Sequence, residues 1–182
     1  MCPGGQQQIM SETGQARRPE GTMTRTMAHS PAAGGFSRKT PDGKAAMPDG
    51  HAAKTIDELL MEARALLPHR PSPAEALGAQ ANGALLIDIR GDDQRRADGL
   101  IPGAILLPRN ALEWRCDLAS QWRHPALTRR DQPLILICQE GFQSSLAAAT
   151  LQRLGLVNAT DLDGGFAAWA AAGLPVTRAS TG

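Results

Sequence analysis

Two short, uninterrupted apolar runs constrain the fold of this chain more than any other feature. They are "ALLIDI" (84–89) and "PLILIC" (133–138). Apolar residues at nearly every position are typical of strands that are buried on both faces, as in parallel sheets. Two further strands are predicted in shorter and more polar runs, "GAILLP" (103–108) and "ATDLDGG" (159–165).

Helical segments separate the predicted strands. "TIDELLMEARALL" (55–67) carries apolar residues near helical spacing, and Thr55 with Glu58 forms a capping box at its start. Further helices are predicted over residues 72–83, 144–155 and 166–173. Strands that alternate with helices predict an α/β domain, with a small parallel β-sheet flanked by helices on both faces.

Residues 1–53 differ in composition from the rest of the chain. Among Ile, Leu, Val, Phe and Trp they contain only Ile9 and Phe36, so they offer little apolar surface to bury. We expect a disordered N-terminal arm; a basic targeting arm is the alternative, although no amphipathic periodicity supports it. Residues 54–182 are expected to form one domain with two leading helices and core motifs at 84–176.

Composition excludes several classes of protein. Lys and Arg number 19 against 18 Asp and Glu, so no basic surplus indicates nucleic acid as a partner. The longest apolar runs are too short to span a membrane, and no apolar signal-peptide core is present. The three cysteines have neither the spacing of a disulfide framework nor that of a zinc site. These features predict a cytoplasmic protein without a metal.

Cys138 ends one of the buried runs, and ligands bind at the carboxyl edge of open α/β sheets. The loop 139–143 contains Gly141, which permits a tight bend, and Ser144 or Ser145 can cap the helix that follows. Loop N–H groups at a helix N-terminus favour a thiolate, which is the nucleophilic form of cysteine. Alternatively, Cys138 is simply the last buried residue of its strand.

The stretch 84–176 resembles a rhodanese domain, the single-domain sulfurtransferase family. Three motifs similar to those of the family occur in order: "LLIDIR" (85–90), "DGLIPGAILLP" (98–108) and "LDGGFAAWAAAGLPV" (162–176). Between the second and third, Cys138 falls where the family keeps its catalytic cysteine.

The resemblance implies ping-pong nucleophilic catalysis. Cys138 would take sulfane sulfur from a small donor such as thiosulfate and pass it from a persulfide to a thiol or cyanide acceptor, or to an acceptor protein. No metal or organic cofactor would be needed. Residues expected to bind the substrate are Gln139, Glu140, Gly141, Phe142, Gln143, Ser144 and Arg90, and Asp88 is expected to be structural beside them.

The loop "CQEGFQS" departs from the family pattern at one charged position. Gln143 stands where the Cys-x-x-Gly-x-Arg loop usually has arginine, which predicts poor use of the thiosulfate dianion. The sixth residue after the cysteine is Ser144, which argues against the related phosphatase with its Cys-x5-Arg loop. The usual histidine of the "GHIPGA" motif is replaced by Leu100.

Several residues have two interpretations. Arg90 either attracts an anionic donor or braces neighbouring loops in an ion pair with Asp88. Glu140 either points to solvent or selects a less negative substrate, and Phe142 is either a lip of the pocket or packs on another loop. Cys116 either packs in the core or resolves an oxidised Cys138. A solvated surface is expected for Arg95, Arg96, Arg129 and Arg130.

Two other functions remain open beside the sulfurtransferase. The first is a non-catalytic rhodanese-like module that binds a partner or carries sulfur between proteins. The second is a redox sensor in which Cys138 reacts with peroxide.

Overall fold

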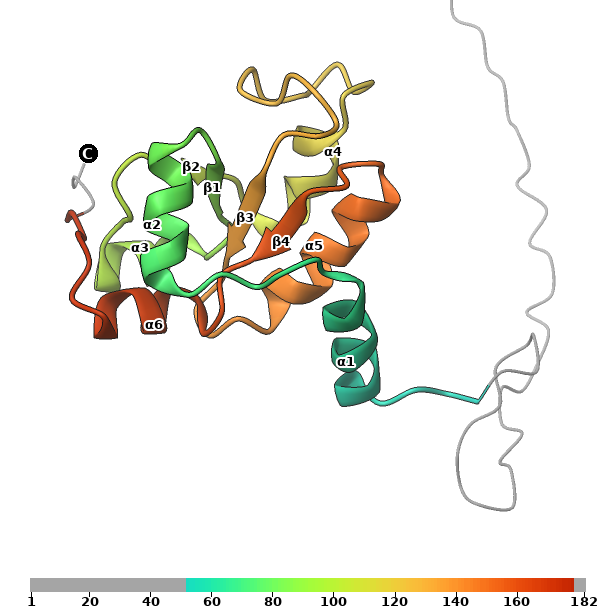
Figure 1. The fold of residues 1–182 in the computed structure, drawn as a ribbon, viewed down its shortest axis with the longest axis horizontal. Coiled ribbons are helices and arrows are strands. Elements are labelled where there is room, and N and C mark those ends of the chain that lie inside the picture. The colour runs from blue at the N-terminus through green and yellow to red at the C-terminus, as the bar shows by residue number, and fades with distance from the viewer. Residues whose placement is uncertain (1–51, 179–182) are drawn as a thin grey trace, which may run out of the picture. The chain divides into compact units, whose positions relative to one another are not determined.

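The computed structural model describes residues 52–178, in which four parallel strands form one sheet (Figure 1). The strand order is β2-β1-β3-β4, with bounds Leu85–Asp88 for β1, Ile105–Leu106 for β2, Leu134–Ile137 for β3 and Ala159–Asp161 for β4. The predicted α/β fold with a small parallel sheet is confirmed, although β2 is much shorter than its apolar run. The predicted arm falls almost wholly outside the described residues.

Helices connect and cover these strands. Their bounds are Ile56–Leu66 for α1, Pro73–Ala81 for α2, Asp92–Asp98 for α3, Leu112–Cys116 for α4, Gln143–Arg153 for α5 and Gly165–Ala171 for α6, with a 3-10 turn η1 at Arg109–Ala111. The sequence pattern did not single out α3, η1 and α4, because they are short and "DDQRRAD" of α3 has no apolar face.

Both leading helices begin at capping boxes. The Thr55 hydroxyl accepts from the N–H of Glu58, and the Glu58 carboxylate accepts from the N–H of Thr55 at 2.7 Å. Ser72 and Glu75 repeat the arrangement at the start of α2. These reciprocal bonds satisfy N–H groups that a helix start leaves without partners, so both helix starts are fixed.

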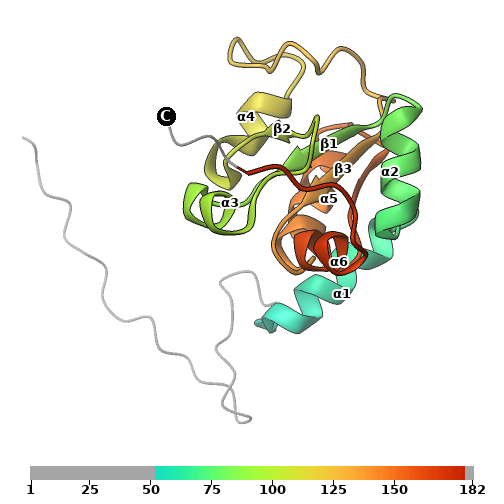
Figure 2. The same cartoon turned by 90° about the vertical axis from the view of Figure 1, so that its left-hand side faces the viewer.

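Alternate residues of the central strands face two separate cores. One core contains Leu134 and Leu136 of β3 together with Ala147 and Leu151 of α5. The other contains Ile135 and Ile137 of β3 with Ala76 of α2, Phe166 and Trp169. Figures 1 and 2 show α4 and α5 on one side of the sheet and α2 and α6 on the other. The central strands are therefore buried on both faces, which explains their unbroken apolar runs.

The parallel register brings the carboxyl ends of three strands together. Asp88 at the end of β1 pairs with Ile137, and Asp161 at the end of β4 pairs with Leu136. Cys138 follows β3 directly, so the chain gathers Cys138 and two buried carboxylates at one edge of the sheet. Across residues 52–178, no helix has the length and hydropathy needed to cross a membrane.

Candidate functional site

Cys138 lies at the mouth of α5 with its sulfur facing backbone donors. The Sγ atom accepts from the N–H of Gly141 at 3.1 Å and of Ser144 at 3.4 Å, and it lies 3.1 Å from the Ser144 hydroxyl. Gly141 has φ +80°, which lets the loop turn its N–H back toward the sulfur. The sulfur thus faces N–H donors at the first turn of α5, a geometry in which backbone groups can hold an anion.

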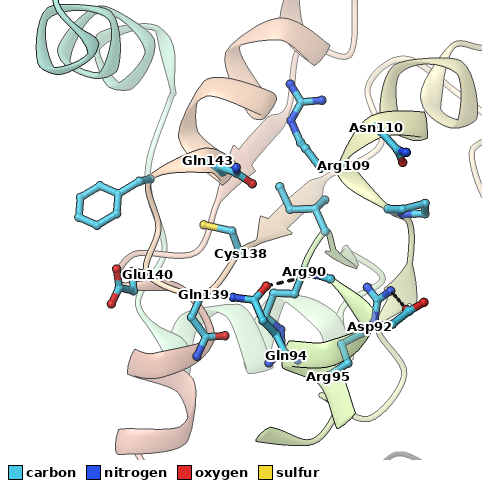
Figure 3. Close-up of a pocket in the computed structure, with 14 residues that line it drawn as sticks. Arg90, Asp92, Gln94, Arg95, Arg109, Asn110, Cys138, Gln139, Glu140 and Gln143 are labelled. Carbon is cyan, nitrogen blue, oxygen red and sulfur yellow. Dashed lines mark hydrogen bonds and ion pairs between the residues drawn. The ribbon is translucent and has the colours of Figure 1, made fainter. Parts of the chain in front are cut away.

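A pocket of about 510 Å³ opens in front of Cys138 (Figure 3). Its walls are the end of β1 with the start of α3, the segment around η1, and the loop after β3. Of the residues expected to bind substrate, the pocket is lined by Arg90, Gln139, Glu140, Phe142 and Gln143. Gly141 and Ser144 instead reach the sulfur through their N–H groups.

Ser144 and Ser145 do not cap α5, contrary to the prediction. The N-cap residue is Phe142, without a side-chain cap, so both serines lie inside the first turn and are buried. Each hydroxyl lies 2.9 Å from Oδ2 of Asp161 and can donate to it. The buried carboxylate needs donors, and the Ser144 hydroxyl supplies one. The single proton of the Ser145 hydroxyl goes either to Asp161 or to the Gly141 carbonyl, which also lies 2.9 Å away.

Asp161 is a functional candidate that the sequence reasoning missed. Its side chain is fully buried, and Arg70 donates to it from Nε at 2.8 Å and from Nη2 at 3.3 Å. Burial alone would lower the pKa of Arg70, but hydrogen bonding and attraction from Asp161 and Asp163 raise that pKa overall. In the sequence, the polar residues that end the run "ATD" (159–161) were the feature that could have indicated Asp161. Asp161 thus links Arg70 to Ser144, which touches the sulfur.

Asp88 and Arg90 form a buried ion pair at the pocket floor. Both side chains are 0 % exposed, and Arg90 Nη2 donates to Asp88 Oδ2 and to the Gly99 carbonyl, each at 2.8 Å. The Arg90 guanidinium also stacks on the Phe166 ring, 3.6 Å from its centroid. These contacts favour the bracing role for Arg90, although its Nη1 atom has no hydrogen-bond partner among the described residues.

Arg95 was wrongly expected on a solvated surface. It is buried, donates to the Asp88 carbonyl at 3.3 Å and pairs with Asp92. Helix α3 turns Arg95 inward over the end of β1, an arrangement that a run of charged residues does not reveal. The expectation holds for the exposed residues Arg96, Arg129 and Arg130.

The structure shows the surroundings of three side chains for which the sequence allowed two interpretations. Glu140 is exposed and points away from Cys138 in Figure 3. Phe142 is 53 % exposed beside the pocket, with the Arg64 guanidinium 5.7 Å from its ring centroid. Cys116 is fully buried in the core; desolvation, followed by the Glu113 charge, raises its pKa to about 12. Cys116 therefore stays a protonated, packed thiol near neutral pH.

The start of α6 braces the cysteine loop from the other side. The N–H of Phe166 donates to the Cys138 carbonyl at 2.9 Å, and the N–H of Ala167 donates to the Gln139 carbonyl at 3.0 Å. The motif "GGFAAW" thus holds the backbone of the loop as well as filling the core through Trp169, whose Nε1 donates to the Pro175 carbonyl at 3.0 Å. Within residues 52–178, no group of three or more acidic, histidine or cysteine residues could hold a metal ion.

Comparisons with known proteins identify the family of this fold. The family model of the rhodanese-like domain matches residues 72–172. A thiosulfate sulfurtransferase GlpE of Pseudomonas entomophila is 38% identical over 100 residues, which cover 55% of this chain and 83% of the relative.

Two solved structures share the fold. A protein of unknown function and possible tyrosine phosphatase from Rhodopseudomonas palustris superposes with a TM-score of 0.63 at 31% identity, covering 72% of this chain and 99% of that one. The polysulfide-sulfur transferase homodimer of Wolinella succinogenes gives a TM-score of 0.54 at 25% identity, covering 69% and 88%.

Proposed function

The chain belongs to the rhodanese-like domain family, and from that membership we propose that it is a sulfurtransferase whose Cys138 carries sulfane sulfur as a persulfide. The observation that carries the proposal is the environment of the Cys138 sulfur. Two N–H groups converge on it at 3.1 and 3.4 Å, and it faces an open pocket. The activities of the sulfurtransferase relatives support the same reaction class.

The proposed reaction has two displacement steps. The Cys138 thiolate attacks the outer sulfur of thiosulfate, the S–S bond of the donor breaks, and sulfite leaves with the bonding electron pair. The persulfide anion that forms stays beside the N–H groups of Gly141 and Ser144. An acceptor such as cyanide or a thiol then attacks the outer sulfur, and the Cys138 thiolate is regenerated. Neither step needs an external oxidant or reductant.

The other loop residues have supporting roles in this proposal. Gln143 lines the pocket and can donate amide hydrogen bonds to an anionic donor. Gln139 also lines it, but its amide nitrogen donates to Asp98 at 3.0 Å. Phe142 supplies an apolar lip, the Glu140 carboxylate at the pocket edge points away from Cys138, and Arg90 with Asp88 holds the floor. Cys116 and Cys138 are free thiols, which supports a reducing compartment such as the cytoplasm.

Mass spectrometry of the intact protein tests the proposal. After incubation with thiosulfate, we expect the wild type to gain the mass of one sulfur atom, and we expect cyanide to remove it with formation of thiocyanate. Cys138→Ser should show neither change. A protein that gains sulfur but passes it only to a protein thiol would be the sulfur-carrier module. A protein that gains oxygen from peroxide and no sulfur from thiosulfate would be a redox sensor, and the proposal would fail.

A phosphatase is not favoured by the geometry, although one structural relative is a possible tyrosine phosphatase. The sixth residue after Cys138 is Ser144, and its side chain is buried against Asp161 rather than directed at a ligand. A phosphate group would therefore lack the arginine fork that grips its oxygens.

Gln143→Arg should improve thiosulfate turnover. Gln143 is exposed beside the pocket, and a charge-assisted hydrogen bond to a dianion contributes about 1.5–3 kcal/mol. We expect kcat/KM for thiosulfate to rise roughly tenfold, mainly through a lower KM, and the gain to shrink with salt. Gln121→Arg, which adds the same charge at another exposed position, is the control. Unchanged or slower turnover in Gln143→Arg would mean that the donor binds away from this side chain.

A further inference from the structure

The arginines that line the pocket have their charges paired. Each lies within 2.8 Å of a carboxylate oxygen: Arg90 of Asp88, Arg95 of Asp92, and Arg109 of Glu113. The position where the family loop usually has arginine holds the neutral Gln143. Among the described residues that line the pocket, no unpaired cation therefore faces an anionic sulfur at Cys138.

Arg64 reaches the same loop from behind. It belongs to α1, which packs along α5 and precedes the region 72–172 that the family model matches. Its Nη2 donates to the Gly141 carbonyl at 2.9 Å, and its Nε donates to the Ser145 hydroxyl at 3.3 Å. In the part of the chain that the structure describes, none of the hydrogen bonds of Arg64 goes to a carboxylate.

Arg70 differs from Arg64 although it lies nearby. It also approaches the Gly141 carbonyl, but at 3.4 Å, and its guanidinium pairs with Asp161 at 2.8 Å and with Asp163 at 2.7 Å. Two carboxylates thus neutralise Arg70, whereas Arg64 has no carboxylate among its hydrogen-bond or ion-pair partners within residues 52–178.

The contact between Arg64 and Gly141 bears directly on the sulfur. The carbonyl of Gly141 faces Arg64, and the N–H of the same residue donates to Cys138 Sγ at 3.1 Å. Gly141 has a positive φ, which residues other than glycine rarely adopt. The orientation of its peptide groups therefore depends on the hydrogen bonds that neighbouring residues make to them. Arg64 and the Ser145 hydroxyl each lie 2.9 Å from that carbonyl oxygen. The guanidinium therefore helps to fix the orientation of Gly141, and it places positive charge beside the loop.

We propose that Arg64 is a positioning residue of the sulfur site, which aims the Gly141 N–H at Cys138 and supplies the positive charge that Gln143 does not. This makes the sulfur selective for anionic reactants over neutral ones of the same size. The consequence of the Arg64 charge for sulfur transfer rests on the proposed function, but the electrostatic effect of that charge on the Cys138 thiol does not.

Alkylation of Cys138 measures this effect without any sulfur transfer. In both reagents the thiolate attacks the methylene carbon and iodide leaves, but iodoacetate is an anion whereas iodoacetamide is neutral. The ratio of their rates, followed by peptide mapping, therefore reports the local charge. For Arg64→Gln we expect the iodoacetate-to-iodoacetamide ratio to fall roughly fivefold, because a partly screened charge near the sulfur is lost. Arg64→Lys should stay within about twofold of the wild type.

Arg153→Gln is the matched control. Arg153 is exposed and stands at the far end of α5, about 15 Å along the helix axis from its first turn. The Arg153→Gln variant loses the same charge as Arg64→Gln and should leave the iodoacetate-to-iodoacetamide ratio unchanged. All variants are compared well below their melting temperatures, so that each is folded during alkylation.

The outcomes separate the two proposals. If Arg64→Gln keeps the wild-type ratio, or if Arg64→Lys falls as far as Arg64→Gln, the charge of Arg64 does not act on Cys138 and the inference is overturned. If the ratio falls as expected but the wild type gains no sulfur from thiosulfate, the inference stands and the sulfurtransferase proposal fails. If both hold, kcat/KM for thiosulfate should also fall about fivefold in Arg64→Gln.

Discussion

Gly165→Ala should remove most of the transfer activity and lower the free energy of unfolding by about 3 kcal/mol. Gly165 has φ +62°, and a Cβ added there would lie 2.6 Å from the Cys138 carbonyl oxygen, 2.7 Å from Gly141 N and 2.8 Å from Glu140 N. All three atoms are backbone atoms of the cysteine loop, so no side chain can rotate away. The loop must shift, and the N–H of Gly141 must lose its aim at the sulfur.

Gly173→Ala is the control for this substitution. Gly173 ends the same helical segment with φ +66°, but a Cβ there meets nothing within 4 Å. It therefore carries the backbone strain without the clash and should cost only about 1 kcal/mol, with activity retained. Urea unfolding and the thiocyanate assay measure both variants. Equal losses in the two would show that strain alone, rather than contact with the loop, makes Gly165 necessary.

Asp161→Asn should destabilise the protein by about 2–3 kcal/mol and lower sulfurtransferase activity at least tenfold. Removing the buried charge of an ion pair is costly because its partner loses compensation, and Arg70 would keep only the exposed Asp163. Here the remaining donors are Arg70, Ser144 and Ser145, and an amide presents them with a single acceptor oxygen and two unwanted N–H donors. Because Ser144 also touches Cys138 Sγ, its displacement disturbs the sulfur as well as the fold.

Asp163→Asn provides the comparison for Asp161→Asn. Asp163 pairs with the same Arg70 at 2.7 Å, but its side chain is 62% exposed. Exposed ion pairs contribute at most about 1 kcal/mol, so this variant should unfold close to the wild type and keep its activity. Chemical denaturation monitored by circular dichroism measures the free energy of unfolding of both variants. If Asp161→Asn is no less stable than Asp163→Asn, the buried carboxylate is not what fixes Ser144.

The sequence predicted the parts of the site that depend on local pattern. The four apolar residues 134–137 predict a strand that ends at Cys138. Gly141 predicts a bend, because glycine readily adopts backbone angles that other residues avoid. The capping boxes of α1 and α2 were likewise readable, since each needs only two residues three positions apart.

Contacts between distant segments could not be read in the same way. Arg64 and Gly141 are separated by 77 residues, and Arg70 and Asp161 by 91, so no short pattern connects them. Ser144 and Ser145 looked like helix caps because serine is common there, but tertiary contact with a buried carboxylate determined their use. Arg95 stands in a run of charged residues, which is typical of a solvated surface. It is buried because α3 packs on the end of β1, a tertiary contact that the run does not reveal.

The bonds between α6 and the cysteine loop set an order of events during synthesis. A ribosome produces Cys138 before Phe166 and Ala167, whose N–H groups hold the carbonyls of Cys138 and Gln139. A nascent chain that has exposed only β3 and α5 therefore carries the thiol without the backbone support of its finished site. The backbone of the cysteine loop is completed late in translation, when the segment that follows β4 docks against the sheet.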